Sequence, residues 1–392
     1  MIGRHALARL LRLARGFPVV VLTGPRQSGK TTLARAAFPG YAWVSLEDPD
    51  VRERVAADPR GFLAQHAGAG AGVVVDEVQR VPQLLSYLQT AVDAGREMGR
   101  WVLTGSQNLL LSQAVSQSLA GRAGYLELLP LSYAEAPQRF ARMSLDECLV
   151  TGAYPALFDR DVPHAEWHAG YVATYVERDV RQISRVADLL LFQRCMRMMA
   201  ARTGQLLNLN ALAGDLGIAQ TTARDWLAVL EASYVVFRLP PYHTNFGKRL
   251  VKTPKLYFHD TGLAAWLLGV TDAATMNTHP MRGALFENLL VTEYLKYCRN
   301  HGVGNAMYFW RDNIGNEVDL LVERAGELWP IEMKSGATFQ PEWLRCLDTW
   351  QRHAAQARRG TGLLISAAPG NHAVDGTMAA HWRDALLTLR EP

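Results

Sequence analysis

Three short apolar runs in the first third of the chain predict buried strands of a parallel sheet. The runs are Val19–Leu22, Gly72–Val75 and Trp101–Thr104. Apolar runs of this length that do not alternate with polar residues are typical of strands covered on both faces. A stretch of helical character, Thr32–Ala37, follows closely on the first run. We therefore expect an α/β fold here, with ligands at the carboxyl edge of the sheet.

The segment between the first strand and this helix has the pattern of a phosphate-binding P-loop. Gly24 and Gly29 allow backbone N–H groups to turn toward phosphate oxygens, and the helix N-terminus adds partial positive charge. Lys30 would reach the β- and γ-phosphates, and the Thr31 hydroxyl would bind Mg²⁺. The alternative is a plain turn that contains glycine. The residues expected to bind ATP in this segment are Gly24, Pro25, Arg26, Gln27, Ser28, Gly29, Lys30, Thr31 and Thr32.

Two acids, Asp76 and Glu77, follow directly on the second apolar run. At the carboxyl edge of a parallel strand, Asp76 would hold Mg²⁺ through water, and Glu77 would act as general base toward the attacking water. The alternative is an exposed acidic pair at the start of a helix, where the helix dipole favours negative charge. The P-loop upstream favours the functional interpretation.

Polar residues after the third run and a later arginine complete the predicted nucleotide site. Ser106, Gln107 and Asn108 are three candidates for the side chain that senses the γ-phosphate, and the sequence neither chooses among them nor excludes a polar turn. Arg122 is either an arginine finger or an ordinary surface residue. A finger would place active sites between subunits, so this interpretation predicts a homo-oligomer.

The middle of the chain has a helical pattern from about Ser144 to Thr203. Within it, three arginines at helical spacing form a face that we expect to be solvated; these are Arg178, Arg181 and Arg185. His164 and His168 lie four residues apart without the glutamate placement of a zincin motif, so we expect both on the surface.

Two helices joined by a tight turn are predicted next. Asn210 is the expected N-cap of the first helix, and Gly217 would end it in a left-handed turn. The second helix runs from Gln220 to Glu231 and has one apolar face, formed by Ala223, Trp226, Leu227 and Leu230. This helix–turn–helix spacing would bring three residues to the base edges of a nucleic acid: Gln220, Thr221 and Arg224.

Two strand-like segments, Tyr234–Leu239 and Lys255–Phe258, predict the two-stranded wing of a winged helix. No acid lies between Ala232 and His259, whereas the basic residues there are Arg238, Lys248, Arg249, Lys252 and Lys255. Such a wing suits phosphate contacts, which we expect from Lys248, Arg249 and Lys252. The alternative is a lid or interdomain module that does not contact DNA.

The last third contains the spacing Asp319-x12-Glu332-x-Lys334 on two strand-like segments, which resembles the PD-(D/E)xK nuclease core. In that arrangement Asp319 and Glu332, with Glu287 from a helix, would bind one or two Mg²⁺, and Lys334 would orient or activate the attacking water. Glu317 competes with Asp319 as the acid because both fall on one face of a strand. The alternative is an exposed Glu–Lys charge pair.

Taken in order along the chain, these motifs resemble the bacterial and archaeal AAA-like ATPases in which an ATPase core precedes a DUF4143 domain. The resemblance covers essentially the whole chain. It continues in Ser118–Arg122, Leu128–Glu135, Gly152–Pro155 and Tyr175–Asp179. It implies an additional-strand P-loop core, Mg²⁺-dependent ATP binding, ATP hydrolysis and a nuclease-like C-terminal fold.

The expected fold class is therefore α/β, with a P-loop NTPase core, a winged-helix domain and a C-terminal α/β restriction-endonuclease-like domain. We expect the ATPase core in residues 1–140, a helical connector in 141–205, the winged helix in 206–272 and the nuclease-like domain in 273–392. A length of 392 residues accommodates several such domains.

Composition bears on the partners and the cellular location that we expect for this protein. The net charge of +4 is too mild to prove a nucleic-acid partner. Four widely spaced cysteines suggest reduced thiols, and no apolar run is long enough to span a membrane, so we expect a cytoplasmic protein. Two hypotheses follow: an ATP-driven protein that acts on DNA or RNA, or an ATP-dependent regulatory switch that binds a protein or nucleic-acid partner without cutting.

Overall fold

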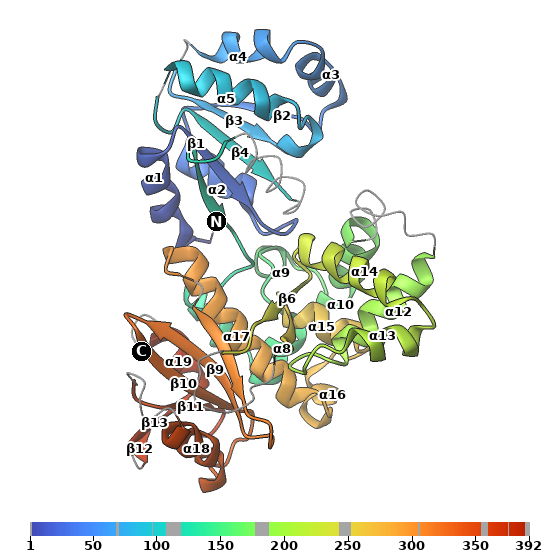
Figure 1. Ribbon diagram of the computed structural model, residues 1–392, viewed down its shortest axis with the longest axis vertical. Coiled ribbons are helices and arrows are strands. Elements are labelled where there is room, and N and C mark those ends of the chain that lie inside the picture. Colours follow the sequence, from blue (N-terminus) through green and yellow to red (C-terminus); the bar gives the residue numbers. More distant parts are fainter. Residues whose placement is uncertain are drawn as a thin grey trace. The chain divides into compact units, whose positions relative to one another are not determined.

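The computed structural model describes residues 2–67, 70–95, 97–106, 119–176, 188–242, 252–304, 306–353, 360–374 and 376–388. The chain forms two compact units (Figure 1). The first comprises residues 1–131, 232–234 and 299–302, and the second comprises 132–231, 235–298 and 303–392. Several residues singled out by the sequence lie outside the described ranges: Gln107, Asn108, Arg178, Arg181, Arg185, Lys248 and Arg249.

The first unit is built on a five-stranded parallel sheet with the order β2-β3-β4-β1-β5. Its strands are β1 (Val19–Thr23), β2 (Ala42–Ser45), β3 (Val73–Asp76), β4 (Trp101–Gly105) and β5 (Ala123–Glu127). The three strands predicted from apolar runs are therefore confirmed. Because β4 lies between β1 and β3, the sheet has the additional strand that the resemblance implies.

Helices cover both faces of this sheet. They are α1 (Ala6–Gly16), α2 (Lys30–Ala37), α3 (Pro49–Ala57), α4 (Pro59–Ala67) and α5 (Leu84–Gly95), with a 3₁₀ turn η1 (Val78–Arg80). Successive residues of β1 point to opposite faces, so Val20 and Leu22 pack with α1 and α2, whereas Val19 and Val21 pack with α4 and α5. This burial on both faces explains the continuous apolar runs.

The second unit begins with short helices. They are η2 (Tyr133–Glu135), α7 (Pro137–Phe140), α8 (Leu145–Thr151), α9 (Ala156–Asp159), α10 (His164–Tyr171), the π-helical η3 (Val172–Val176), α12 (Leu189–Ala200), α13 (Leu209–Leu216), α14 (Gln220–Ala232), α15 (Thr261–Leu267) and α16 (Ala273–Thr278). The antiparallel pair β6 (Val236–Leu239) and β7 (Lys255–Phe258) follows α14 in the chain. The predicted apolar face of α14 is buried, and Gly217 takes the predicted left-handed turn (φ 69°).

Two sequence predictions in this part are wrong. The N-cap of α13 is Asn208, whose Oδ1 accepts a hydrogen bond from the Ala211 N–H at 3.0 Å, so the helix begins two residues earlier than Asn210 suggested. His168 is fully buried, because α8 and α15 pack against α10. Its Nε2 lies 3.1 Å from the Thr151 carbonyl oxygen, in a space that Gly262 leaves free.

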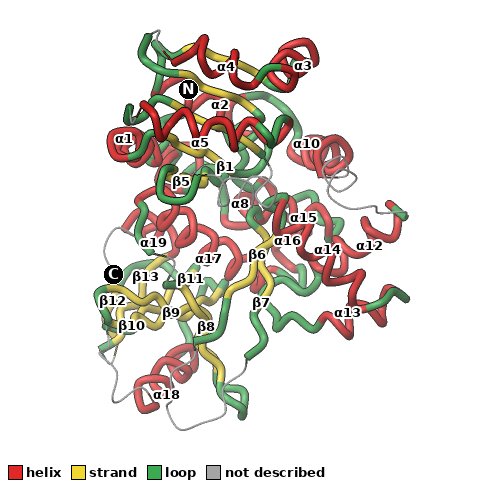
Figure 2. The backbone as a smooth tube through the Cα atoms, turned by 45° about the horizontal axis from the view of Figure 1, so that its top comes forward, coloured by secondary structure: helices red, strands yellow, loops and turns green. Residues whose placement is uncertain are grey.

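The rest of the second unit is a six-stranded mixed sheet with the order β12-β13-β11-β10-β9-β8 (Figure 2, yellow). Its strands are β8 (Met307–Arg311), β9 (Glu317–Arg324), β10 (Glu327–Lys334), β11 (Leu363–Ser366), β12 (His372–Val374) and β13 (Thr377–His381). The associated helices are α17 (Arg282–His301), η4 (Pro341–Leu344), α18 (Arg345–His353) and α19 (Trp382–Thr388). Leu347 and Trp350 of α18 pack on apolar side chains of β9, β10 and β11, which forms the core of this part.

Candidate functional site

The loop between β1 and α2 has a backbone that glycine alone adopts easily. Gly24 has φ 144°, and a Cβ atom there would lie 2.1 Å from the backbone oxygen of Leu128. Gly29 has φ 93° and is the N-cap residue of α2. Gln27 also has a positive φ of 60°. The loop is thus tightly curved, which turns its N–H groups inward in front of a helix N-terminus and suits an anion.

Two side chains of this loop fit a phosphate ligand. The buried Lys30 donates hydrogen bonds from Nζ to the carbonyl oxygens of Gly24 and Pro25, at 2.9 and 2.8 Å. The hydroxyl of Ser28 is fully buried and has no hydrogen-bond partner among the described residues. A lysine held against the loop and a buried hydroxyl that still lacks a partner provide donors for phosphate oxygens.

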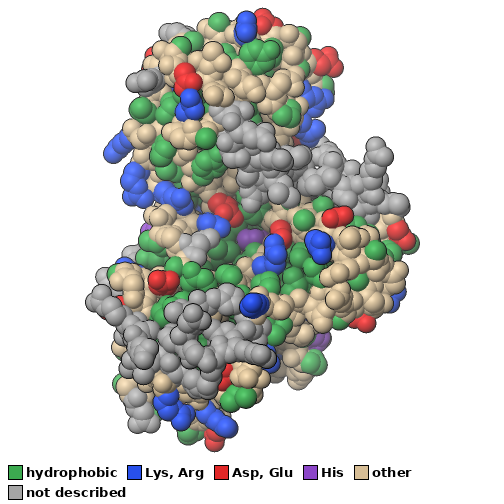
Figure 3. All heavy atoms as spheres, viewed as in Figure 1, with side chains coloured by type: hydrophobic (Ala, Val, Ile, Leu, Met, Phe, Trp, Pro, Cys, Tyr) green, Lys and Arg blue, Asp and Glu red, His purple; other side chains and the backbone are tan. Residues whose placement is uncertain are grey.

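Arg4, which precedes α1, forms hydrogen bonds that stabilise the same loop. Its guanidinium donates to the carbonyl oxygen of Ser28 at 2.6 Å and to that of Leu129 at 2.7 Å. The planar fork of arginine can hold two carbonyls at once, so Arg4 links the loop to the segment after β5. Sequence analysis missed this role, since an arginine before an amphipathic helix carries no local signal. Arg12 and Arg15 of α1 are exposed. Figure 3 shows the Lys and Arg side chains of one face of the molecule in blue.

Asp76 and Glu77 lie at the carboxyl end of β3, on the sheet edge that carries the P-loop. The Thr104 hydroxyl, at the end of β4, donates to the Asp76 carboxylate. The Ser106 hydroxyl donates to Glu77 Oε2 at 3.2 Å, and the Gln79 amide donates to the same oxygen. Sequence analysis identified Ser106 but not Thr104, whose contact with Asp76 depends on β4 lying beside β3, and it did not identify Gln79, which bonds to Glu77 two residues away.

Glu77 has an unusual backbone for a residue that is not glycine, with φ 56° and ψ 45°. Left-handed conformations of this kind cost free energy and are concentrated at functional sites. The conformation turns the chain sharply between β3 and η1 and leaves the Glu77 carboxylate beside Ser106. Position, strain and hydrogen bonding together mark Glu77 as a candidate general base.

Arg122 lies at the opposite edge of this sheet. Its carbonyl oxygen accepts a hydrogen bond from the N–H of Val19 at the start of β1. Its guanidinium makes two hydrogen bonds to Asp93, at 2.6 and 2.8 Å. One strand of five residues, roughly 17 Å long, separates Arg122 from the P-loop, so it does not reach a nucleotide bound in its own subunit.

The residues predicted to contact a nucleic acid differ in exposure. Gln220, Thr221 and Arg224 are exposed at the N-terminal end of α14, and Lys252 is exposed before β7. The prediction that Lys255 is part of a basic surface wing is wrong. Its side chain is 2% exposed and lies in ion pairs with Glu287 and Glu317. The sequence misleads here because its acidic partners come from α17 and β9, far along the chain.

Four carboxylates from α17, β9 and β10 form an acidic cluster within the second unit: Glu287, Glu317, Asp319 and Glu332. Lys255 Nζ lies 2.8 Å from Glu287 Oε1 and 2.5 Å from Glu317 Oε1. Lys334 Nζ contacts Glu332 and lies 3.9 Å from Asp319 Oδ2. The structure thus gathers the residues of the predicted nuclease-like motif, but with two lysines among them.

Burial governs the electrostatics of this cluster. It raises the pKa of Glu287 to about 7 despite Lys255, and burial together with Asp319 raises the pKa of Glu332 to about 8 despite Lys334. Burial lowers the pKa of Lys255, but Tyr257 and the surrounding carboxylates outweigh it and hold the pKa well above its usual value. Lys255 therefore remains a cation at neutral pH.

The predicted metal ligands Glu287, Asp319 and Glu332 do not fit a metal site in this structure. Throughout the described ranges, no group of three or more Asp, Glu, His or Cys side chains is arranged to hold a metal ion. The physical reason is that Lys255 binds the Glu287 carboxylate, while Asp319 Oδ2 accepts the Met333 N–H at 2.9 Å. These oxygens are already satisfied by protein donors.

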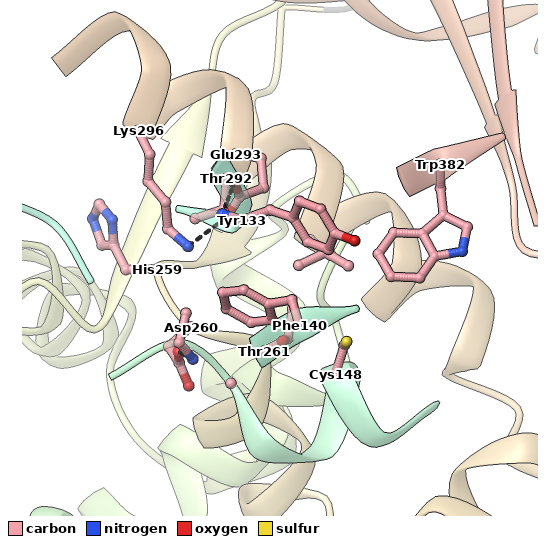
Figure 4. Close-up of a pocket in the computed structure, with 13 residues that line it drawn as sticks. Tyr133, Phe140, Cys148, His259, Asp260, Thr261, Thr292, Glu293, Lys296 and Trp382 are labelled. Carbon is pink, nitrogen blue, oxygen red and sulfur yellow. Dashed lines mark hydrogen bonds and ion pairs between the residues drawn. The ribbon is translucent and has the colours of Figure 1, made fainter. Parts of the chain in front are cut away.

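A second polar cluster in the same unit surrounds a small pocket (Figure 4). Glu293 and Lys296 of α17 form a buried ion pair of 2.7 Å, and Glu293 also accepts the Tyr133 N–H at 2.7 Å. The pocket has a volume of about 10 Å³, which holds roughly one water molecule. We assign this cluster a structural role, because it joins α17 to the start of η2.

None of the helices in the described part of the chain is long and apolar enough to cross a membrane. All four cysteines, which lie within the described ranges, are free thiols, as the sequence predicted.

Comparison with known proteins places the chain in a family. A model described as an AAA domain matches residues 16–136, and two domains of unknown function, DUF8612 and DUF4143, match residues 142–274 and 282–382. The uncharacterized proteins Rv2008c of Mycobacterium tuberculosis and Mb2031c of Mycobacterium bovis are each 35% identical over 339 residues, which is 86% of this chain and 74% of theirs. Among solved structures, the Walker-type ATPase PABY2304 of Pyrococcus abyssi is 14% identical, with a TM-score of 0.46 over 68% of this chain and 96% of its own. The chain therefore belongs to the family of AAA-domain proteins with a C-terminal DUF4143 domain, and its first unit is the P-loop core of that family.

Proposed function

We propose that the protein is a Mg²⁺-dependent ATPase whose site is the carboxyl edge of the sheet in the first unit. One observation carries this proposal. Lys30 follows β1, Asp76 and Glu77 lie at the end of β3, and both strands end at the same edge of the sheet with β4 between them. Mg²⁺ and ATP, when bound, would supply the cation that neutralises developing charge and the phosphoryl group.

Each side chain then has a definite task. Lys30 would exchange its bonds to the Gly24 and Pro25 carbonyls for phosphate oxygens, and the Thr31 hydroxyl with Asp76 would hold the metal ion. Glu77 accepts a proton from the attacking water at its carboxylate, which Ser106 orients by the 3.2 Å hydrogen bond.

Nucleotide affinity tests the first step. Purified Lys30→Ala should bind a fluorescent ATP analogue far more weakly than the wild type, because the buried cation facing the phosphates is lost. Arg54→Ala, on the exposed surface of α3, is the matched control and should bind like the wild type. Equal affinity of Lys30→Ala and the wild type would remove the P-loop assignment.

We further propose that the second unit associates with nucleic acid. The exposed residues Gln220, Thr221 and Arg224 begin a helix that follows a tight glycine turn, and the pair β6–β7 comes next, which is the element order of a winged helix. Lys252, exposed near the hairpin, adds a positive charge for phosphate. The six-stranded sheet with α17 is consistent with a restriction-endonuclease-like fold that grips a nucleic acid.

Fluorescence anisotropy with labelled duplex DNA, single-stranded DNA and RNA tests this association. Affinity should fall as salt rises, and Arg224→Ala should weaken binding, since each phosphate contact releases counterions. Arg54→Ala again serves as the control on the other unit. Absence of salt-dependent binding to all three probes would favour the second candidate function, an ATP-dependent switch for a protein partner.

A further inference from the structure

We propose that the ε-ammonium of Lys255 is the resident cation of the acidic cluster, so that this cluster binds no divalent metal and the second unit does not cleave phosphodiesters. The proposal concerns a different site from the ATPase and does not depend on it. It rests on the position of one side chain that the sequence places in a surface wing and the structure places in a buried site.

Lys255 enters the cluster from β7 and meets carboxylates from two other elements. Its Nζ lies 2.8 Å from Glu287 Oε1 on α17 and 2.5 Å from Glu317 Oε1 on β9. The Tyr257 hydroxyl donates to the same Glu287 oxygen at 2.5 Å. The ammonium also lies 5.5 Å from the centre of the Phe309 ring. Because the lysine is buried and charged, removing it from these partners would leave its charge without compensation in a low dielectric.

The remaining carboxylates are also engaged. Arg311 lies 3.0 Å from Glu317 Oε2, Asp319 accepts the Met333 N–H, and Lys334 contacts Glu332. Three cations therefore face four carboxylates, so the cluster is close to neutral with protein groups alone. Mg²⁺ requires near-octahedral oxygen ligands at about 2.0–2.1 Å, and a chelate that used Glu287 Oε1 would compete with Lys255 for that oxygen.

One oxygen of the cluster, Glu332 Oε2, is buried without a hydrogen-bond partner among the described residues. Its carboxylate is already paired with Lys334 through Oε1, and a single monodentate oxygen does not make a Mg²⁺ site with the lysines in place. A metal ion bound through Glu287 Oε1 or Glu317 Oε1 would have to displace Lys255, and the hairpin β6–β7 would then lose its ionic link to α17 and β9.

Manganese binding by the full-length, nucleotide-free protein tests this proposal. Every variant, and the parent protein with which they are compared, carries Asp76→Asn, which removes the carboxylate proposed to hold the metal ion of the ATPase site. Equilibrium dialysis should show no saturable Mn²⁺ site in the parent, which retains Lys255. Lys255→Met should gain a site approaching one ion per chain, and adding Glu287→Gln should abolish that gain. Arg238→Met, which removes an exposed cation from β6 of the same hairpin, should behave like the parent.

Thermal unfolding of proteins that retain Lys255 gives a second measurement that does not depend on whether Lys255→Met folds. Added Mn²⁺ should shift the unfolding midpoint of the parent and of its Asp319→Asn derivative equally. A saturable Mn²⁺ site in the parent would overturn the proposal. A rise in the parent's unfolding midpoint with Mn²⁺ that Asp319→Asn removes would overturn it too. Mn²⁺-dependent cleavage of plasmid or single-stranded DNA that Lys334→Ala abolishes would overturn it as well.

Discussion

Arg4 offers the sharpest test of how the P-loop is held, because it is outside the motif and contacts it through two hydrogen bonds. Its guanidinium donates to the Ser28 and Leu129 carbonyls at 2.6 and 2.7 Å. Hydrogen bonds from charged donors contribute about 1.5–3 kcal/mol each. Since Arg4 is half-buried, we take the lower value, which gives about 3 kcal/mol for the pair.

Arg4→Ala should therefore weaken nucleotide binding without removing any group that touches the nucleotide. If about half of that free energy is used to hold the loop in its binding conformation, the Kd rises roughly tenfold. Arg4→Lys provides a single point charge in place of a fork, so it should recover about one of the two bonds and lie between the wild type and Arg4→Ala.

Titration with a fluorescent ATP analogue measures the effect, and urea unfolding of the same samples shows whether the folded state is retained. Arg15→Ala, an exposed arginine of α1, is the matched control. The reasoning is refuted if Arg4→Ala binds nucleotide as tightly as Arg15→Ala while both are folded.

Two further predictions concern other positions. Gly24→Ala should destabilise the protein by about 2–4 kcal/mol in urea unfolding and abolish nucleotide binding, because its Cβ would lie 2.1 Å from the Leu128 oxygen at φ 144°; Gly16→Ala, with open space around it, should do neither. Burial lowers the pKa of His168, so its stabilising contribution is present above the usual pKa of about 6.5 and is lost as pH falls through the lower folded pKa. His168→Gln should flatten the fall in urea midpoint between neutral and mildly acidic pH, and an unchanged slope would contradict this.

Sequence patterns predicted three of the five strands of the first unit and its P-loop, since these strands are buried on both faces and the loop requires glycine. The apolar runs Val19–Leu22, Gly72–Val75 and Trp101–Thr104 alone predict strands that the structure places within one residue of these bounds. The edge strand Ala42–Ser45 is partly exposed and short, so no continuous run marks it. Thr104 contacts Asp76 only because β4 lies beside β3.

The second unit was harder to predict because its important partners are distant in the chain. Lys255 and Glu287 are separated by 32 positions, and a basic stretch without acids looked like a surface wing. His168 is a polar residue that is expected on a solvated helix face, yet α8 and α15 cover it. In both cases tertiary packing, which a local pattern does not contain, decided the environment.

ATP turnover by the Glu77→Gln variant tests the central claim most directly. The wild type should release phosphate from ATP steadily and only with Mg²⁺. Glu77→Gln should bind nucleotide with similar affinity but hydrolyse it at least roughly a hundredfold more slowly, because the base is lost while the binding loop is intact. Glu53→Gln, an exposed position on α3, should turn over like the wild type. Hydrolysis by Glu77→Gln at the wild-type rate would contradict the account.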